Sequence, residues 1–301
     1  MRILVTDGMD KSAIAKLTSL GHEVVEQFYE SDELGKALRD FDVVVVRSKT
    51  KVRKQHIDEA KGSTLKLIIR GGVGVDNIDV DYAKENGIDV KNTPNASSES
   101  VAEIAMAHMF SCARYISHAG YTMRNDQWEK KAYGKGIELT GKTLGIIGFG
   151  RIGQKLAILA KAIGMKVIVF NRSQIPGIEE KLGMKYVTLD EVLAESDFIS
   201  LHAPAIDGGA LINAERIAKM KDGVIIINTS RGVNIDEDAL LDALNSGKVR
   251  AAGLDVFVDE PTANKALYTH PMVSCTPHIG AATNEAQERI GVEIVDIISA
   301  M

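Results

Sequence analysis

Short, continuous apolar runs recur along the whole chain and alternate with segments of helical periodicity. A run of about four apolar residues is typical of a strand buried on both faces, as in parallel sheets whose connections are helices. The pattern therefore predicts an α/β protein built from doubly wound parallel sheets. The expected strands cover residues 3–5, 43–46, 67–69, 144–147, 167–170, 198–201 and 224–227.

Composition narrows the class of protein further. With 301 residues, 45% of them hydrophobic, the chain can form about two domains. The net charge of -5 and the scattered basic residues argue against a nucleic-acid or membrane partner, so a small-molecule partner is expected. Cys112 and Cys275 lie in apolar segments, where we expect packing roles in a reducing compartment. The N-terminus lacks the pattern of a signal peptide, which indicates the cytoplasm.

The longest helical pattern predicts how the domains are arranged. A single helix is expected over residues 98–125, with one apolar face, and it is long enough to bridge two domains. A capping box at Thr188 and Glu191 predicts another helix start. We expect a Rossmann nucleotide domain at 93–284, inserted into a flavodoxin-like substrate domain of residues 1–92 and 285–301, with the site in the cleft between them. The face of the long helix contains Val101, Ile104, Ala105, His108 and Cys112.

A glycine pattern follows one of the predicted strands and opens a helix. Gly148 permits a tight turn, Gly150 lets the backbone approach a pyrophosphate, and Gly153 lets helix and strand pack closely. Such a pattern is weak evidence by itself. Because strand, turn, helix and second strand all occur at the right spacing, a Rossmann dinucleotide site is expected rather than a glycine-rich turn without a ligand.

The strand after this helix ends on Asn171 and Arg172, where an acid is usual. A carboxylate there would bind the adenosine ribose of NAD and repel the 2′-phosphate of NADP, and Asn171 removes that repulsion. Arg172 is able to pair with a 2′-phosphate, stack on adenine or point to solvent. We expect NAD as the cofactor, and NADP stays open.

Three polar residues of the second half each follow an expected strand. They are Arg231, after the strand at 224–227, and Glu260 and His278, after two further strands expected to end near Leu254 and Cys275. Singly, each has an ordinary structural explanation as a surface ion-pair member, a turn residue or a loop histidine. Beside a dinucleotide site they fit hydride transfer from an alcohol, which needs an acid/base, a carboxylate that orients it and a cation for the substrate.

With these residues in place, the chain resembles the D-2-hydroxyacid dehydrogenase family. The resemblance implies that Arg231 anchors the substrate, that Glu260 partners the base and that His278 is the general acid/base. The residues it implies for cofactor binding are Gly148, Gly150, Arg151, Ile152, Gly153, Asn171, Arg172, His202, Ala203, Pro204, Thr229, Asp255 and Gly280. The matching stretches cover residues 47–52, 70–79, 92–95, 100–103, 139–153, 229–232, 255–257 and 277–287.

The resemblance also bears on the substrate. Arg47, Arg70 and Lys130 fall in segments similar to those that contact phosphate in phosphoglycerate dehydrogenases, and Val73 and Gly74 resemble a turn whose amides hold the substrate carboxylate. Each lone cation could also be a solvated charge. Lys130 stands where an arginine is more familiar, so bidentate phosphate binding is doubtful there. No metal site is expected.

Within the family, the chain is most similar to enzymes that use NAD to oxidise D-3-phosphoglycerate to 3-phosphohydroxypyruvate in serine biosynthesis. The alternatives are an NADPH-dependent glyoxylate or hydroxypyruvate reductase, another D-2-hydroxyacid dehydrogenase, and a nucleotide-sensing binding protein of the same fold. Longer relatives carry C-terminal regulatory domains for which this sequence has no room after Met301, so inhibition by serine through such a domain is not expected. Related enzymes pair through the nucleotide domain, which implies a homodimer contact at the helix from Ser98 and at Trp128, although Trp128 could instead pack in the core.

Overall fold

The computed structural model describes residues 1–205 and 208–301 and divides into two compact units. The first unit contains Met1–Ser98 and Ala281–Met301, and the second contains Glu99–Gly280. Each unit is an α/β layer structure around a parallel sheet, so the expected fold class is confirmed. The expected domain boundaries after residues 92 and 284 stay a proposal.

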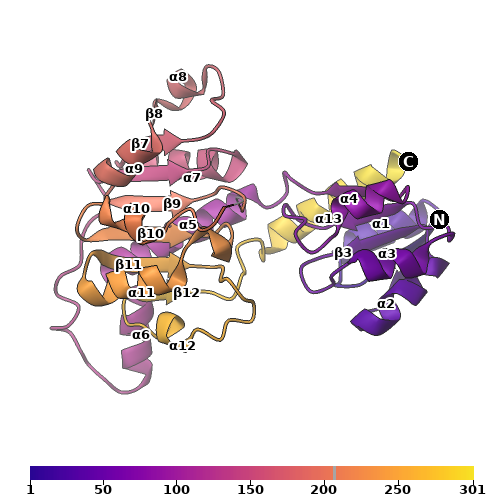
Figure 1. Cartoon of the computed structure of the whole chain (residues 1–301), viewed down its shortest axis with the longest axis horizontal. Coiled ribbons are helices and arrows are strands. Elements are labelled where there is room, and N and C mark those ends of the chain that lie inside the picture. Colours follow the sequence, from indigo (N-terminus) through magenta and orange to yellow (C-terminus); the bar gives the residue numbers. More distant parts are fainter. Residues whose placement is uncertain (206–207) are drawn as a thin grey trace. The chain divides into compact units, whose positions relative to one another are not determined.

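The first unit has a five-stranded parallel sheet with the order β2-β1-β3-β4-β5. Alternate residues of its central strands face opposite sides. Ile3 and Val45 pack under α1 and α13, whereas Leu4 and Val44 pack under α2, α3 and α4. In Figure 1 the yellow helix α13 lies with the indigo α1, so both chain ends belong to this unit. Its elements are β1 (Arg2–Val5), α1 (Lys11–Ser19), β2 (Glu23–Glu26), α2 (Ser31–Ala37), η1 (Leu38–Asp40), β3 (Val43–Val46), α3 (Lys54–Ala60), β4 (Leu67–Arg70), α4 (Val80–Glu85), β5 (Asp89–Asn92) and α13 (Asn284–Ser299).

The second unit has a seven-stranded parallel sheet with the order β12-β11-β10-β9-β6-β7-β8. This order reverses direction between β6 and β9, and open α/β sheets bind ligands at such a switch point. Helices α5 and α7 cover one face, and α9, α10, α11 and α12 cover the other. Its strands are β6 (Thr143–Ile147), β7 (Lys166–Phe170), β8 (Lys185–Tyr186), β9 (Phe198–Leu201), β10 (Val224–Asn228), β11 (Val249–Leu254) and β12 (Val273–Cys275). Its helices are α5 (Ser98–Arg114), α6 (Ile116–Arg124), α7 (Arg151–Ala162), α8 (Ile178–Leu182), α9 (Leu189–Glu195), α10 (Ala214–Ala218), η2 (Gly232–Asn234), α11 (Glu237–Ser246) and α12 (Lys265–Tyr268).

The prediction of a single helix over residues 98–125 is wrong, because the helix is interrupted between α5 and α6. Tyr115 adopts a left-handed conformation with φ of 59°, which interrupts the helical hydrogen bonds. A residue far along the sequence stabilises this interruption, since Arg250 donates a 2.8 Å hydrogen bond to the Tyr115 hydroxyl. Helical periodicity could not reveal a partner in a different strand.

Other local predictions are confirmed. All the expected strands form, including those before Glu260 and His278, which are β11 and β12. Thr188 caps α9, where its hydroxyl accepts from the Glu191 amide at 3.2 Å and its own amide donates to the Glu191 carboxylate at 2.7 Å. Both cysteines are free thiols, Cys112 buried and Cys275 half-buried. None of the helices in the described part of the chain is long and apolar enough for a membrane span.

Candidate active site

The glycine turn follows β6 at the switch point of the second sheet. Gly148 has a φ of +95°, and a Cβ there would lie 2.4 Å from the Ala203 amide nitrogen. A Cβ on Gly153 would lie 2.6 Å from the Gly148 carbonyl oxygen. These two glycines therefore let the turn pack against the end of β9 and against α7. Gly150 differs, because nothing lies within 4 Å of its Cβ position.

The open space at Gly150 adjoins the N-terminus of α7. No described side chain caps this helix, whose first turn consists of Arg151, Ile152 and Gly153 and has no acidic residue. Uncapped amide groups and the positive end of the helix dipole attract an anion. The turn therefore fits a diphosphate that approaches over Gly150.

Two buried polar atoms lie at the ends of the neighbouring strands. Within the described residues, Nδ1 of His202 after β9 and Oγ1 of Thr229 after β10 have no hydrogen-bond partner. Strands β9 and β10 are paired, so these ends lie at one edge of the sheet. Ala203 and Pro204 follow His202 along that edge. Because buried polar atoms normally have partners, the two orphans fit a polar ligand bound beside the glycine turn.

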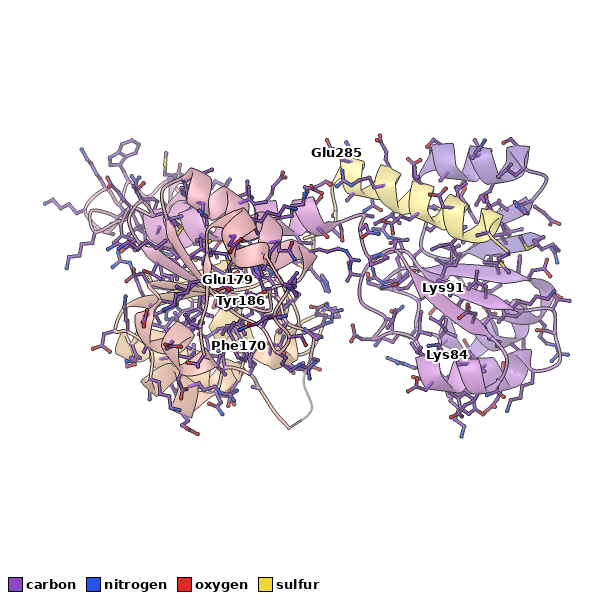
Figure 2. The ribbon with its side chains drawn as sticks, turned by 90° about the horizontal axis from the view of Figure 1, so that it is seen from above. Lys84, Lys91, Phe170, Glu179, Tyr186 and Glu285 are labelled. Atoms are coloured by element: carbon purple, nitrogen blue, oxygen red, sulfur yellow. The ribbon has the colours of Figure 1, made fainter. Side chains whose placement is uncertain are left out.

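Asn171 closes the other side of the turn. Its side-chain oxygen accepts from the Phe149 amide at 3.1 Å, and its side-chain nitrogen donates to the Ser173 carbonyl at 2.5 Å. Arg172 is exposed. Asn171 thus ties the glycine turn to the loop after β7 and places no negative charge there. Figure 2 labels Phe170 at this end of β7, together with Tyr186 and Glu179, which are joined by a 2.9 Å hydrogen bond.

Arg231 lies on a loop that a buried polar network shapes. The side-chain oxygen of Asn228 accepts from the amide and the hydroxyl of Ser230, and its side-chain nitrogen donates to the Arg231 carbonyl at 2.8 Å. Asn234 donates to the Ser230 hydroxyl and to the Ala203 carbonyl. This network joins the Arg231 loop to the segment after β9.

The Arg231 loop also touches the loop that carries Glu260. A Cβ on Gly232 would lie 1.9 Å from the carbonyl carbon of Phe257, so only glycine allows this backbone contact. Glu237 binds the same loop, where its carboxylate accepts from the Val258 amide at 2.9 Å and from Asn264 at 2.8 Å. The positions of Arg231 and Glu260 are therefore set by direct packing of their loops.

Glu260 and His278 form a hydrogen-bonded pair. The distance from Nδ1 of His278 to Oε2 of Glu260 is 2.6 Å, and the Phe257 amide donates to the other carboxylate oxygen at 3.2 Å. Burial would raise the pKa of Glu260, but the bond and charge of His278, the Phe257 amide and the Arg231 charge together lower this pKa below its ordinary value. Glu260 is thus held as an anion that fixes the imidazole, whose Nε2 is not used in the pair.

Asp255 holds the segment that carries His278. Its side chain is 1% exposed, and its carboxylate accepts from the Thr276 hydroxyl and from the amides of Ile279 and Gly280. Its carbonyl accepts from the His278 amide at 2.8 Å. These bonds account for the left-handed conformation of His278, with φ of 53°. A cofactor contact of Asp255 or Gly280 stays a prediction.

Two of the expected substrate cations lie at adjacent strand ends in the first unit. Arg70 ends β4, opposite Val46 of β3, and Arg47 follows Val46 directly. Asp7 shapes the Arg47 loop, since its carboxylate accepts from the amides of Arg47 and Thr50 and from the Thr50 hydroxyl. Burial lowers the pKa of Arg47, and the Asp7 charge opposes this change.

The turn at Val73 and Gly74 follows β4 at this same edge of the sheet, with the Val73 side chain exposed. The Asn92 side chain donates to the Val73 carbonyl at 2.6 Å. Lys130 is an exposed residue of the second unit. Trp128 is 79% exposed, so the alternative of core packing for Trp128 is wrong.

Several residues that support the site were not among the predicted site residues. The signal for Asp7 was a carboxylate at the end of a predicted strand, and Glu237 stands in the first turn of a helix. His108 was noted only for its helix face. The missed supporting residues are Asp7, Asn77, His108, Asn228, Asn234, Glu237 and Thr276.

This geometry agrees with comparisons to known proteins. Residues 106–280 match the family described as D-isomer specific 2-hydroxyacid dehydrogenase, NAD binding domain. A hydroxypyruvate reductase of Thermotoga maritima is 51% identical over 99% of this chain and 97% of its own length. A D-3-phosphoglycerate dehydrogenase of Methanocaldococcus jannaschii is 45% identical over 99% of this chain, which spans 57% of that relative. The solved D-lactate dehydrogenase of Aquifex aeolicus, complexed with NAD and lactic acid, has a TM-score of 0.86 at 33% identity, with 99% of this chain and 94% of that chain covered.

The chain therefore belongs to the D-2-hydroxyacid dehydrogenase family. It is an oxidoreductase, and its cofactor is NAD(P), since solved structures similar to this chain contain NAD or NADPH.

Proposed function

We propose that the chain is an NAD-dependent D-3-phosphoglycerate dehydrogenase that forms 3-phosphohydroxypyruvate, a step of serine biosynthesis. The observation that carries the proposal is the pair of guanidinium groups, Arg47 and Arg70, at adjacent strand ends beside the Val73–Gly74 turn. A 2-hydroxy acid without phosphate needs one cationic partner for its carboxylate, and Arg231 would take that role. Two further arginines are suited to a phosphate dianion.

The residues of the second unit support the chemistry. Arg231 would bind the substrate carboxylate, and Nε2 of His278 would take the C2 hydroxyl proton. Glu260 would hold Nδ1 and stabilise the imidazolium that forms. Bound NAD(P) supplies the hydride acceptor. The Gly148 turn, the first turn of α7, His202 and Thr229 are the residues that would hold the cofactor.

A second candidate is a hydroxypyruvate reductase. The relative from Thermotoga maritima that carries this name is matched over 97% of its length, whereas the phosphoglycerate dehydrogenase is matched over 57%. Asn171 also leaves room for NADPH, which a reductase would use. The substrates of the two candidate enzymes share one carbon skeleton and differ in the phosphate at C3.

The decisive experiment compares 3-phosphohydroxypyruvate with hydroxypyruvate as substrates for reduction, with NADH and with NADPH. We expect kcat/KM to favour the phosphorylated acid at least about tenfold, and Arg47→Ala to remove most of that preference, since a charged hydrogen bond contributes about 1.5–3 kcal/mol. Lys84→Ala, which removes an exposed charge of α4 in the same unit, is the matched control. Equal or higher kcat/KM for hydroxypyruvate in the unaltered enzyme would favour the second candidate.

A further inference from the structure

We propose that His108 is a positioning residue, which aligns His278 through a part-buried chain of hydrogen bonds at the carboxyl ends of β11 and β12 in the second unit. The proposal rests on the role proposed above for His278. His108 lies on α5, about 170 positions before the loop that carries His278, and is 3% exposed.

The hydrogen-bond chain consists of Ser274, His108, Thr276 and Asp255. Nδ1 of His108 lies 3.0 Å from the Ser274 hydroxyl, and Nε2 lies 3.0 Å from the Thr276 hydroxyl. The Thr276 hydroxyl donates to the Asp255 carboxylate at 2.6 Å. Ser274 is 8% exposed and Asp255 is 1% exposed, whereas Thr276 between them is half-buried, so both ends of this hydrogen-bond chain are shielded from water.

Asp255, the acceptor at one end, determines which group donates in each hydrogen bond of this chain. Both oxygens of Asp255 accept backbone amides, from Ile279 and Gly280, so the Thr276 hydroxyl must donate its single proton to Asp255. Thr276 is then an acceptor for Nε2 of His108, which must carry a proton. Nδ1 of a neutral imidazole accepts, so Ser274 donates to it. Each member therefore has one role in a single neutral tautomer of His108.

The same carboxylate fixes the backbone around the base. The two amides that it binds follow His278 immediately, and the His278 amide itself donates to the Asp255 carbonyl at 2.8 Å. Because His278 has a φ of 53°, a conformation unfavourable for a non-glycine residue, this segment depends on its anchors. A shift of Asp255 would move the imidazole relative to Glu260.

The fold makes room for the ring of His108. A Cβ on Gly253 of β11 would lie 2.6 Å from Cβ of His108 and 3.1 Å from Cγ, so a side chain at Gly253 would displace the ring. Burial lowers the pKa of His108, although the Asp255 charge opposes this change, and the neutral tautomer is favoured. A general packing role for His108 would not need this arrangement of donors.

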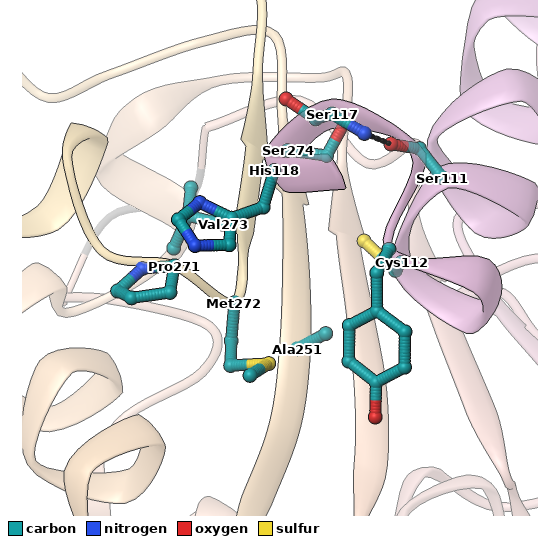
Figure 3. Close-up of a pocket in the computed structure, with 10 residues that line it drawn as sticks. Ser111, Cys112, Ser117, His118, Ala251, Pro271, Met272, Val273 and Ser274 are labelled. Carbon is teal, nitrogen blue, oxygen red and sulfur yellow. Dashed lines mark hydrogen bonds between the residues drawn. The ribbon is translucent and has the colours of Figure 1, made fainter. Parts of the chain in front are cut away.

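A small cavity adjoins the end of the hydrogen-bond chain that lies away from His278. Ser274 lines this cavity together with Cys112, Ala251 and His118 (Figure 3). Its volume of about 10 Å³ is at the lower limit for one water molecule.

Matched substitutions test the proposal. Thr276→Val keeps the shape and removes the hydroxyl, whereas Thr276→Ser keeps the hydroxyl. His108→Phe keeps a ring without nitrogen atoms, whereas His108→Gln retains a donor near the position of Nε2. Ser196→Ala removes a buried hydroxyl that donates only to the Val192 carbonyl of α9, and it is the control for loss of a buried hydrogen bond. His278→Ala reports on the proposed function itself.

We expect Thr276→Val and His108→Phe to lower kcat by about 10- to 100-fold, because both changes misplace the base. Thr276→Ser and His108→Gln should recover most of the loss. The proposal fails if Thr276→Val and His108→Phe keep kcat within twofold, or if the conservative variants lose as much as the others. If Thr276→Val does not fold, the comparison of His108→Phe with His108→Gln decides alone. Retained turnover in His278→Ala would instead reject the proposed base.

Discussion

Nδ1 of His278 lies 2.6 Å from Oε2 of Glu260, although the two residues are 18 positions apart and lie on different loops. The Glu260 loop is held by Glu237, and the His278 segment is held by Asp255. The pair is therefore the product of two independently anchored loops that meet at one edge of the sheet. That arrangement is what an acid/base of fixed orientation requires.

Replacement of Glu260 tests the electrostatic part of this pair. In Glu260→Gln the imidazolium loses its anionic partner, and we expect kcat for oxidation of the hydroxy acid to fall about 10- to 100-fold. Turnover at saturating substrate and cofactor measures this effect, and a kcat within twofold of the unaltered enzyme would show that Glu260 does not act on the base.

The glycine turn gives a pair of opposite predictions. Gly148→Ala would place a methyl group against the backbone of Ala203, so we expect a loss of about 1–3 kcal/mol in the free energy of unfolding. Gly150→Ala meets no atom within 4 Å, so stability should change by less than about 1 kcal/mol. Titration of NADH fluorescence should nevertheless show a Kd at least about tenfold weaker for Gly150→Ala, since the methyl group fills the approach to the diphosphate. Unchanged affinity would mean that the cofactor does not pass over Gly150.

His202 predicts a pH dependence of stability. Burial lowers its pKa in the folded protein to about 4, below the ordinary value of about 6.5. Between these two values the unfolded chain binds a proton that the folded chain does not, so stability falls as pH falls through this window. The slope from this group approaches about 1.4 kcal/mol per pH unit. Urea unfolding at pH 7 and pH 5 should show a smaller loss for His202→Gln than for the unaltered protein, and equal losses would contradict the assignment.

Assembly can be tested on the exposed apolar surface of the second unit. Ile116, Tyr121, Met123 and Trp128 are 58%, 61%, 58% and 79% exposed, and such a group of residues is unusual on a monomer. We expect the unaltered protein to sediment as a homodimer and Tyr121→Glu with Trp128→Glu to sediment as a monomer. Val292→Glu, at a 58% exposed position of α13, is the control. A monomer in the unaltered protein would overturn the prediction.

Much of the architecture could be predicted from the sequence because it depends on local pattern. The buried parallel strand β3 is apolar throughout and β10 is apolar up to its last residue, Asn228, and the turn at Gly148 has a backbone requirement that only glycine meets. The break at Tyr115 could not be predicted in this way, because its partner Arg250 is distant in the sequence.

The residues of the candidate site also differ in whether local sequence pattern predicts them. Arg231, Glu260 and His278 were visible because each follows a predicted strand, and parallel strands end at the same edge of a sheet. The residues that hold these three side chains in place could not be predicted from the sequence. His108 looked like one residue of an apolar helix face, and its bonds to Ser274 and Thr276 depend on the packing of α5 across β11 and β12.

The most direct test of His278 as the acid/base is turnover in His278→Ala, measured at 340 nm with saturating substrate and cofactor, beside the Kd for NADH. We predict that kcat falls at least about 100-fold while the Kd stays within about threefold, because the imidazole moves the proton and does not hold the dinucleotide. Turnover near that of the unaltered enzyme would contradict the assignment of His278 as the acid/base.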